Sequence, residues 1–153
     1  IYITLSMLSA AWGADSAGTR FGVMTVIETE YREGFPIERH LLLEGEDILP
    51  DLKWRESLLF IAVMPTVSSD LVIVEDTNGS QCPALYYIIN VSASSIKATP
   101  QFGSCSDDIL ISWWGDHLRI EMRSTNGWGK DTYLYDAENH VLYFDSELVR
   151  VTE

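Results

Sequence analysis

Basic residues are scarce in this chain, which has 10 Lys and Arg against 23 Asp and Glu in 153 residues, for a net charge of −13. Proteins bind nucleic acids and anionic lipid surfaces largely through Lys and Arg. The shortage therefore argues against a nucleic-acid partner. No apolar run reaches the roughly 20 residues that a membrane-spanning helix needs, so we expect no stable membrane insertion. The acidic excess suits solubility or electrostatic attraction to a basic partner protein.

Histidine and cysteine are also few, and they are too dispersed to indicate a metal or cofactor site. His40, His117 and His140 occur singly, without C-x-x-C or H-x-x-x-H spacing. Ser94 to Lys97 matches S-x-x-K, but the companion motifs of that chemistry are missing. The many carboxylates do not follow the spacing of a calcium loop. We expect no cofactor, no metal and no catalytic residue.

The two cysteines, Cys82 and Cys105, bracket the segment CPALYYIINVSASSIKATPQFGSC. A zinc site needs about four ligands, and a reactive thiol needs a partner base that the sequence does not reveal. In an oxidising compartment a disulfide closing this loop stabilises the fold by roughly 3 to 3.5 kcal/mol on a chain-entropy estimate. We favour the disulfide, with the zinc site and the reactive thiol as alternatives.

Residues 1–14, IYITLSMLSAAWGA, have the pattern of the later part of a secretory signal peptide. An apolar stretch gives way to small residues, including Ala11 and Gly13, as it does before a cleavage site. A first buried strand is the alternative. Export predicts a periplasmic or secreted protein, and it leaves residues 15–153 as a single β domain.

Strand patterns occupy most of residues 15–153. The alternation in 22–31 places Val23 and Ile27 on one face and Glu28 and Glu30 on the other. The apolar run 58–64 is typical of a strand covered on both faces, and the Asn-Gly pair after 71–76 predicts a hairpin with 84–92. Further strand patterns are 37–45, 109–114, 117–123, 132–145 and 148–152, and residues 46–59 could form one short helix or a loop. About ten short strands predict an all-β antiparallel sandwich or barrel.

Aromatic and acidic residues supply the candidate contact surface. Trp113 and Trp114 are adjacent, and because side chains alternate along a strand, only one of them can face the core. We expect the loop 124–131 to cover the other; exposure at a contact surface is the alternative. The candidate contact residues are Trp113, Trp114, Trp128, Glu28, Glu30, Asp107 and Asp108.

The segments DLVIVEDTNGSQCPALYYIINV and TPQFGSCSDDI, together with the leading signal pattern and a closing YLYD, resemble a group of small exported proteins of Gram-negative bacteria that have no assigned activity. The resemblance covers residues 37 to 136, and CPALYY with FGSCSD is its most specific part. It implies a periplasmic or secreted, disulfide-bonded β domain. It carries no functional residue over to this chain.

These observations favour a non-catalytic, exported protein-interaction module, which binds a basic partner as inhibitors or immunity proteins do. One alternative is a small-ligand carrier or minor hydrolase with a pocket at a barrel mouth. Another is a structural envelope protein. The carrier predicts a cavity lined by the aromatic residues, whereas the interaction module predicts an exposed acidic patch beside Trp113 or Trp114.

Overall fold

The computed structural model describes residues 16–28, 31–33, 35–36, 39–48, 57–77, 81–145 and 147–148. Within these ranges the chain forms strands, turns and loops, without a helix. The strands are β1 (Ser16–Thr19), β2 (Gly22–Glu28), β3 (Tyr31–Arg32), β4 (Phe35–Pro36), β5 (Arg39–Leu43), β6 (Glu46–Asp47), β7 (Ser57–Pro65), β8 (Ser69–Thr77), β9 (Leu85–Ser92), β10 (Ile96–Ala98), β11 (Ile109–Trp114), β12 (His117–Arg123), β13 (Lys130–Asp136), β14 (Val141–Phe144) and β15 (Glu147–Leu148).

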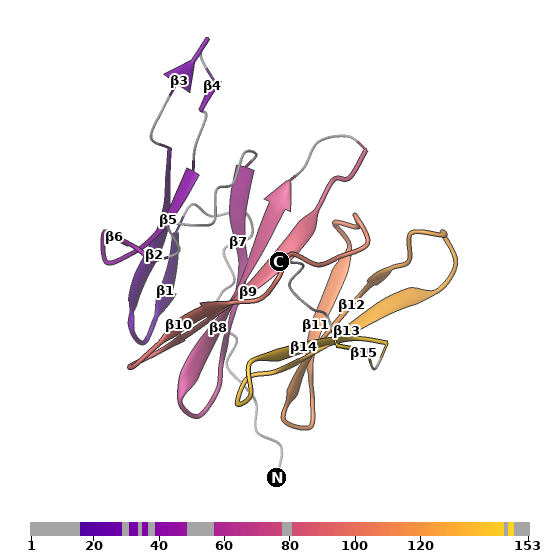
Figure 1. Ribbon diagram of the computed structural model, residues 1–153. Helices are drawn as coiled ribbons and strands as arrows, with labels where there is room; N and C mark the ends of the chain where they lie inside the picture. The colour runs from indigo at the N-terminus through magenta and orange to yellow at the C-terminus, as the bar shows by residue number, and fades with distance from the viewer. Residues whose placement is uncertain are drawn as a thin grey trace.

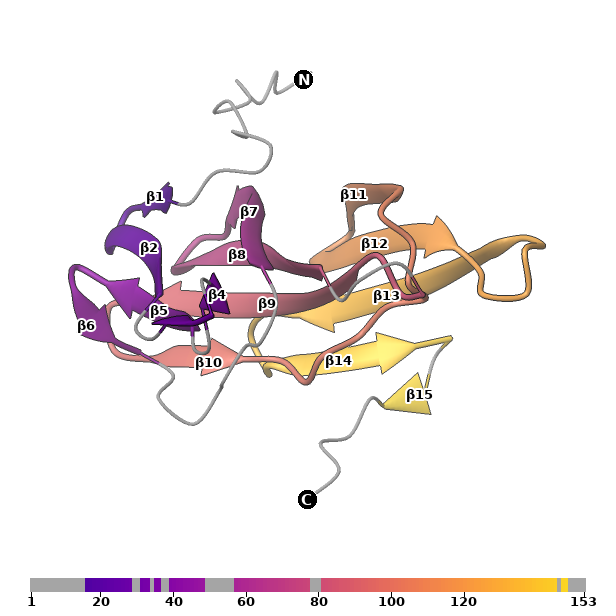
Figure 2. The same cartoon turned by 90° about the horizontal axis from the view of Figure 1, so that it is seen from above.

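The strands form three main sheets, and every strand pair is antiparallel. The N-terminal sheet has the order β1-β2-β5-β6, the central sheet β10-β9-β8-β7, and the C-terminal sheet β11-β12-β13-β14-β15. The central sheet lies between the other two, and the small hairpin β3–β4 stands away from them at one end (Figures 1 and 2). The predicted all-β antiparallel fold is confirmed, and its sheets are layered rather than closed into one barrel.

The central sheet is buried on both faces because a core lies on each side of it. Leu71 and Ile73 of β8 belong to the core shared with the C-terminal sheet, and Val72 and Val74 belong to the core shared with the N-terminal sheet. A strand covered on both sides has no need of polar alternation. The continuous apolar patterns of β7 and β8 follow from this position.

The predicted pairing of β8 with β9 is confirmed, with Asp76 opposite Leu85. The connection runs between Thr77 and Leu85, and its Asn78-Gly79 pair lies outside the described residues. Cys82 lies in this connection and is bonded to Cys105, with sulfur atoms 2.06 Å apart. The predicted disulfide is thus present, and it indicates an oxidising, extracytoplasmic compartment.

Further sequence predictions concern the faces of β2, the segment 46–59 and the two ends of the sequence. The exposed face of β2 carries Val23 and Ile27, and its buried face carries Met24. The segment 46–59 begins and ends as strand, in β6 and β7, while 49–56 lie outside the described residues. The signal-like residues 1–14, Glu30 and the last residues of 148–152 also lie outside them. No helix in the described ranges is long and apolar enough to span a membrane.

A charged clamp joins the N-terminal sheet to the central sheet. Arg20, in the β1–β2 turn, donates from its backbone N–H and from Nε to the two carboxylate oxygens of Asp70, at 2.7 and 2.8 Å. Its Nη2 also donates to the carbonyls of Thr66, in the turn between β7 and β8, and of Ser69, the first residue of β8. The Asp70 side chain is only 3% exposed and that of Arg20 is 47% exposed. The clamp therefore compensates a buried charge with a half-exposed one.

A neutral network joins the central sheet to the C-terminal sheet. Asn90 Nδ2 donates to the hydroxyl of Tyr135 at 3.1 Å, and that hydroxyl lies 2.5 Å from Nδ1 of His140. The other ring nitrogen of His140 faces the carbonyl of Ala98 at 3.3 Å. Since a carbonyl can only accept, Nε2 carries the proton, and Nδ1 accepts from the Tyr135 hydroxyl. Every group in this network is satisfied when the imidazole is neutral.

Candidate protein-interaction surface

The linker between β10 and β11 is fixed to the central sheet before it reaches the disulfide. Phe102 forms an isolated antiparallel bridge with Tyr86, through backbone hydrogen bonds of 2.7 and 3.0 Å. Gly103 follows with φ 134°, and a Cβ placed there would lie 3.3 Å from Cδ2 of Tyr86. Glycine is therefore suited to this position by both backbone angle and space.

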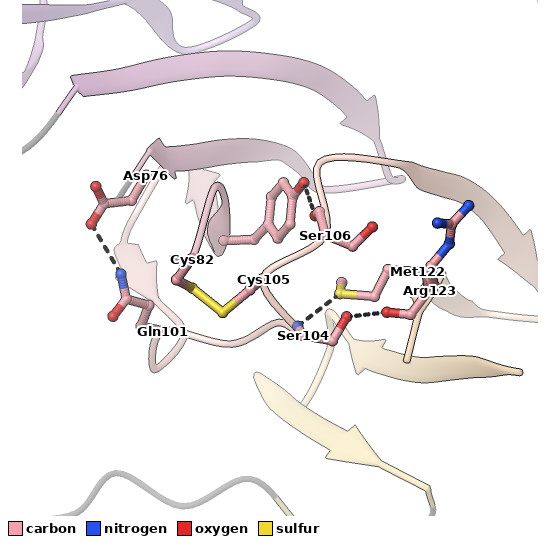
Figure 3. The surroundings of a disulfide bond; sticks show 9 residues. Asp76, Cys82, Gln101, Ser104, Cys105, Ser106, Met122 and Arg123 are labelled. Atoms are coloured by element: carbon pink, nitrogen blue, oxygen red, sulfur yellow. Dashed lines mark hydrogen bonds between the residues drawn. A yellow bond between two sulfur atoms is a disulfide. The ribbon is translucent and has the colours of Figure 1, made fainter. Parts of the chain in front are cut away.

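The next residues tie the linker to β9 and β12 (Figure 3). The Ser104 N–H donates to Sδ of Met122 at 3.1 Å, and the Ser104 hydroxyl donates to the carbonyl of Arg123. The Tyr86 hydroxyl donates to the carbonyl of Ser106 at 2.7 Å. Together with the disulfide, these bonds hold the linker where it presents Asp107 and Asp108, whose side chains are exposed.

The hairpin loop 124–129, here called the Trp128 loop, lies beside these two aspartates. The N–H of Gly127 donates to the carbonyl of Ser124 at 3.0 Å, and the N–H of Trp128 donates to Oδ1 of Asn126 at 2.8 Å. Although the loop is hydrogen-bonded internally, Trp128 is 83% exposed. The loop therefore holds a large aromatic side chain in solvent.

The linker and the Trp128 loop enclose a shallow hollow of about 400 Å³, which we call the acidic hollow. It is lined by Ser104, Cys105, Ser106, Asp107, Asp108, Arg123, Ser124, Thr125 and Gly127. Its two exposed carboxylates outnumber its single guanidinium. It is open to solvent, so it suits a protruding side chain of a partner better than an enclosed small molecule.

Glu75 adds a further carboxylate behind this surface. Burial raises the pKa of Glu75, and the negative charge of Asp107 raises it further. Burial also raises the pKa of the Tyr86 hydroxyl, with the nearby Glu75 and Asp107 carboxylates contributing in the same direction. The carboxylates here repel one another, and a cation placed among them relieves that repulsion.

The structure separates the remaining candidate residues from the acidic hollow. Trp113 is half-buried against the core of the C-terminal sheet, and Trp114 is 58% exposed at the β11–β12 turn. Covering by the loop 124–131 was the wrong prediction, because that loop joins β12 to β13 at the Arg123–Lys130 end, whereas Trp114 pairs with His117 at the opposite end.

Glu28 lies in the N-terminal sheet, where its backbone pairs with Arg39. The central sheet separates it from the hollow, and Glu30 lies outside the described residues. Of the seven candidate residues, the fold therefore brings together Asp107, Asp108 and the loop that carries Trp128. Sequence reasoning missed Glu75, Tyr86 and Arg123, since their proximity depends on how β8, β9 and β12 pack.

The three histidines lie in different parts of the molecule. His40 and His117 each contact an aspartate, Asp47 at 2.7 Å and Asp116 at 2.6 Å, and His140 belongs to the neutral network. Among the described residues, no group of three or more His, Cys, Asp or Glu side chains is arranged to hold a metal ion.

Comparison with protein-family models, curated proteins and solved structures finds no match to this chain.

Proposed function

We propose that the chain is a non-catalytic protein-interaction module, periplasmic or secreted, that binds a basic partner at the acidic hollow in the manner of an inhibitor or immunity protein. The observation that carries the proposal is Trp128, which is exposed on an internally bonded loop beside Asp107 and Asp108. Trp is one of the residues enriched among the hot spots of protein interfaces, together with Tyr and Arg. Adjacent carboxylates add attraction to Lys and Arg.

The electrostatic setting supports the choice of a basic partner. The whole chain carries a net charge of −13, which attracts cationic proteins over distances of about a Debye length. At short range, a Lys or Arg side chain in the acidic hollow offsets the mutual repulsion of Asp107 and Glu75. The same arrangement disfavours anionic ligands.

The alternative of a small-ligand carrier receives less support. Two hollows in the described part of the chain, the acidic hollow and a second one, are both open to solvent, and neither is lined by Trp113 or Trp114. The second hollow, of about 470 Å³, is lined by Phe21, Leu43 and residues 92–96. A carrier is expected to enclose most of its ligand.

Capture followed by titration tests the proposed function. Immobilised protein is exposed to an extracellular and envelope extract at low salt, eluted at high salt, and each released protein is identified, purified and titrated by calorimetry. We expect a basic protein whose affinity falls about 30-fold with Trp128→Ala, the loss of one interface anchor of about 2 kcal/mol. The double variant D107N/D108N should bind more weakly and with a smaller dependence on salt.

Glu46→Gln is the matched control, because Glu46 is an exposed carboxylate in the N-terminal sheet. It should leave the affinity unchanged. A captured partner that binds Trp128→Ala and D107N/D108N as tightly as the unaltered chain contradicts the proposed surface. If nothing is captured and native mass spectrometry shows a bound small molecule, the carrier alternative replaces the interaction module.

A further inference from the structure

The outer edge of the C-terminal sheet is a long strand without the usual protection. In the described residues β11 pairs only with β12, and its other edge makes no backbone hydrogen bond. The strand has six residues, ILISWW, with no charge and no proline. An open edge of this length, about 20 Å, presents roughly three N–H and three C=O groups to solvent.

The other sheet edges within the described residues are short or interrupted. The strands β1, β6, β10 and β15 have four residues or fewer. The nine-residue β7 is disrupted by a register shift between Phe60 and Ala62 and ends at Pro65. Short edges, bulges and prolines are the devices by which β proteins avoid unwanted strand pairing. In the part of the chain that the structure describes, β11 is thus the edge best suited to accept another strand.

The side chains of β11 alternate between the core and solvent, so a strand can be added at its edge without disturbing the core. Ile109, Ile111 and Trp113 pack against the core of the C-terminal sheet. Leu110 and Trp114 point the other way and are 53% and 58% exposed. An added strand can therefore pair with the backbone of β11 and cover Leu110 and Trp114 with its own alternate side chains.

Negative charge at both ends of β11 favours a basic strand over a second copy of this chain as the added strand. Asp107 and Asp108 precede the strand and Asp116 follows it, all with exposed side chains. If a second copy pairs antiparallel with all six residues of β11, Ile109 lies opposite Trp114 of that copy. Asp107 then lies opposite Asp116 of the second copy, at both ends of the ribbon. Like charges directly opposite one another are destabilising, so the edge disfavours self-pairing.

We propose that β11 is a strand-addition site for a basic partner: an extended segment with an uncharged, alternating core of about six residues, flanked by Lys or Arg, adds to the C-terminal sheet. Main-chain hydrogen bonds supply affinity, and the flanking charges supply specificity. The inference rests on the proposed function, since it specifies how the basic partner is held. The acidic hollow adjoins the Asp108 end of this edge, so one partner can occupy both.

Synthetic peptides test the inference directly. The probe is acetyl-Lys-Lys-Thr-Val-Thr-Val-Thr-Val-Lys-Lys-amide, titrated into the full chain by calorimetry at low salt. A second peptide carries N-methyl groups on its two central residues, whose N–H groups point to opposite edges of the strand. Both peptides have the same length and charge. We expect the first to bind and the second to bind at least tenfold more weakly.

Four further outcomes are decisive. Amide exchange of β11 must slow when the first peptide binds, and a peptide with Glu in place of every Lys must bind more weakly. Equal binding of the methylated and unmethylated peptides overturns strand addition but leaves the proposed acidic surface intact, because that surface does not need the peptide backbone. Failure of both peptides to bind overturns strand addition, while capture with the Trp128→Ala variant still judges the proposed function separately.

Reversing the charge of Asp107 tests whether like-charge repulsion keeps two copies from pairing through β11. Asp107→Lys places a cation opposite Asp116 of a second copy at both ends of the paired strands, so this variant should dimerise through β11. Sedimentation should show a concentration-dependent dimer for D107K and a monomer for Glu46→Lys, a charge change of the same size on the other outer sheet. If both variants sediment alike, like-charge repulsion is not what keeps this edge unpaired.

Discussion

The two outer sheets are attached to the central sheet in different ways. The N-terminal sheet packs on a core that is mostly aliphatic, with Phe60 and Tyr87 among its members, and it is clamped by Arg20 and Asp70, a charged pair with one buried partner. The C-terminal sheet packs on a core rich in aromatic rings, and its attachment includes a disulfide and the neutral network of Asn90, Tyr135 and His140. The face that we propose to hold a partner is thus fixed by a covalent bond in the linker that leads into β11 and by uncharged hydrogen bonds.

In the C-terminal part, the groups that stabilise the fold are different from the charged groups that are exposed to solvent. The fixed linker carries Asp107 and Asp108 into solvent next to the Trp128 loop, so the exposed charges of this end are free to meet a partner. In the N-terminal sheet the Arg20 guanidinium is engaged within the fold. A binding surface needs a rigid base, because an ordered surface loses less entropy on binding. The comparison predicts that the two junctions respond differently to reduction, mutation and pH.

The largest expected effect is loss of the disulfide. Replacing both Cys82 and Cys105 by Ser should lower the free energy of unfolding by about 3 kcal/mol, since the unfolded chain regains the entropy of a loop closed over 23 positions. Denaturant unfolding of the variant, and of the unaltered chain under reducing conditions, measures the change. The two should agree. An unfolding midpoint that is unaffected by either treatment would mean that the linker is held by its hydrogen bonds alone.

Breaking the N-terminal clamp should cost slightly less. Arg20→Met leaves the carboxylate of Asp70 buried without its charged partner, and we expect a loss of about 2 to 3 kcal/mol. The estimate is at the low end for a buried pair because Arg20 is half-exposed. Arg123→Met removes an exposed arginine and should change stability by less than about 0.5 kcal/mol. If the two variants unfold alike, the clamp contributes nothing specific.

The neutral network should give the smallest effect and a dependence on pH. Tyr135→Phe removes one buried hydroxyl and should cost about 1 to 2 kcal/mol at neutral pH. Burial lowers the pKa of His140, and Lys97 lowers it further, against the opposing hydrogen bond to Ala98. Because the folded pKa lies below the unfolded value, the contribution of His140 is complete above pH about 6.5 and is lost as the pH falls through the folded pKa.

Unfolding measured between pH 7.5 and 5 checks this sign. The unaltered chain should lose stability with falling pH, and His140→Gln should remove the part of that loss that comes from His140. If His117→Gln removes this loss of stability and His140→Gln does not, the acid sensitivity arises at His117, beside Asp116, and not in the neutral network.

The central sheet and the disulfide could be predicted from sequence because their signals are local. The continuous apolar run of β7 and the position of Cys82 after β8 follow from a few neighbouring residues. The packing of the N-terminal sheet on the central sheet could not be predicted. Alternation in β2 does not show which of its two faces is buried, and Val23 and Ile27 in fact face solvent.

The candidate surface was predictable in part for the same reason. Asp107, Asp108 and Trp128 stand out by charge, ring size and the flanking glycines. Their proximity depends on how β12 and β13 pair, so the sequence pattern grouped Trp128 with Trp113 and Trp114, which lie at the other end of the hairpin. The unprotected edge of β11 is likewise visible only once the order of strands in the sheet is known.

Amide hydrogen exchange of the chain, free and saturated with a captured basic partner, shows which residues the partner covers. We expect slower exchange in residues 104–114 and in the Trp128 loop, with exchange in β2 and β5 of the N-terminal sheet unchanged. Slower exchange confined to the N-terminal sheet, with residues 104–114 and the Trp128 loop unaffected, would contradict the proposed surface.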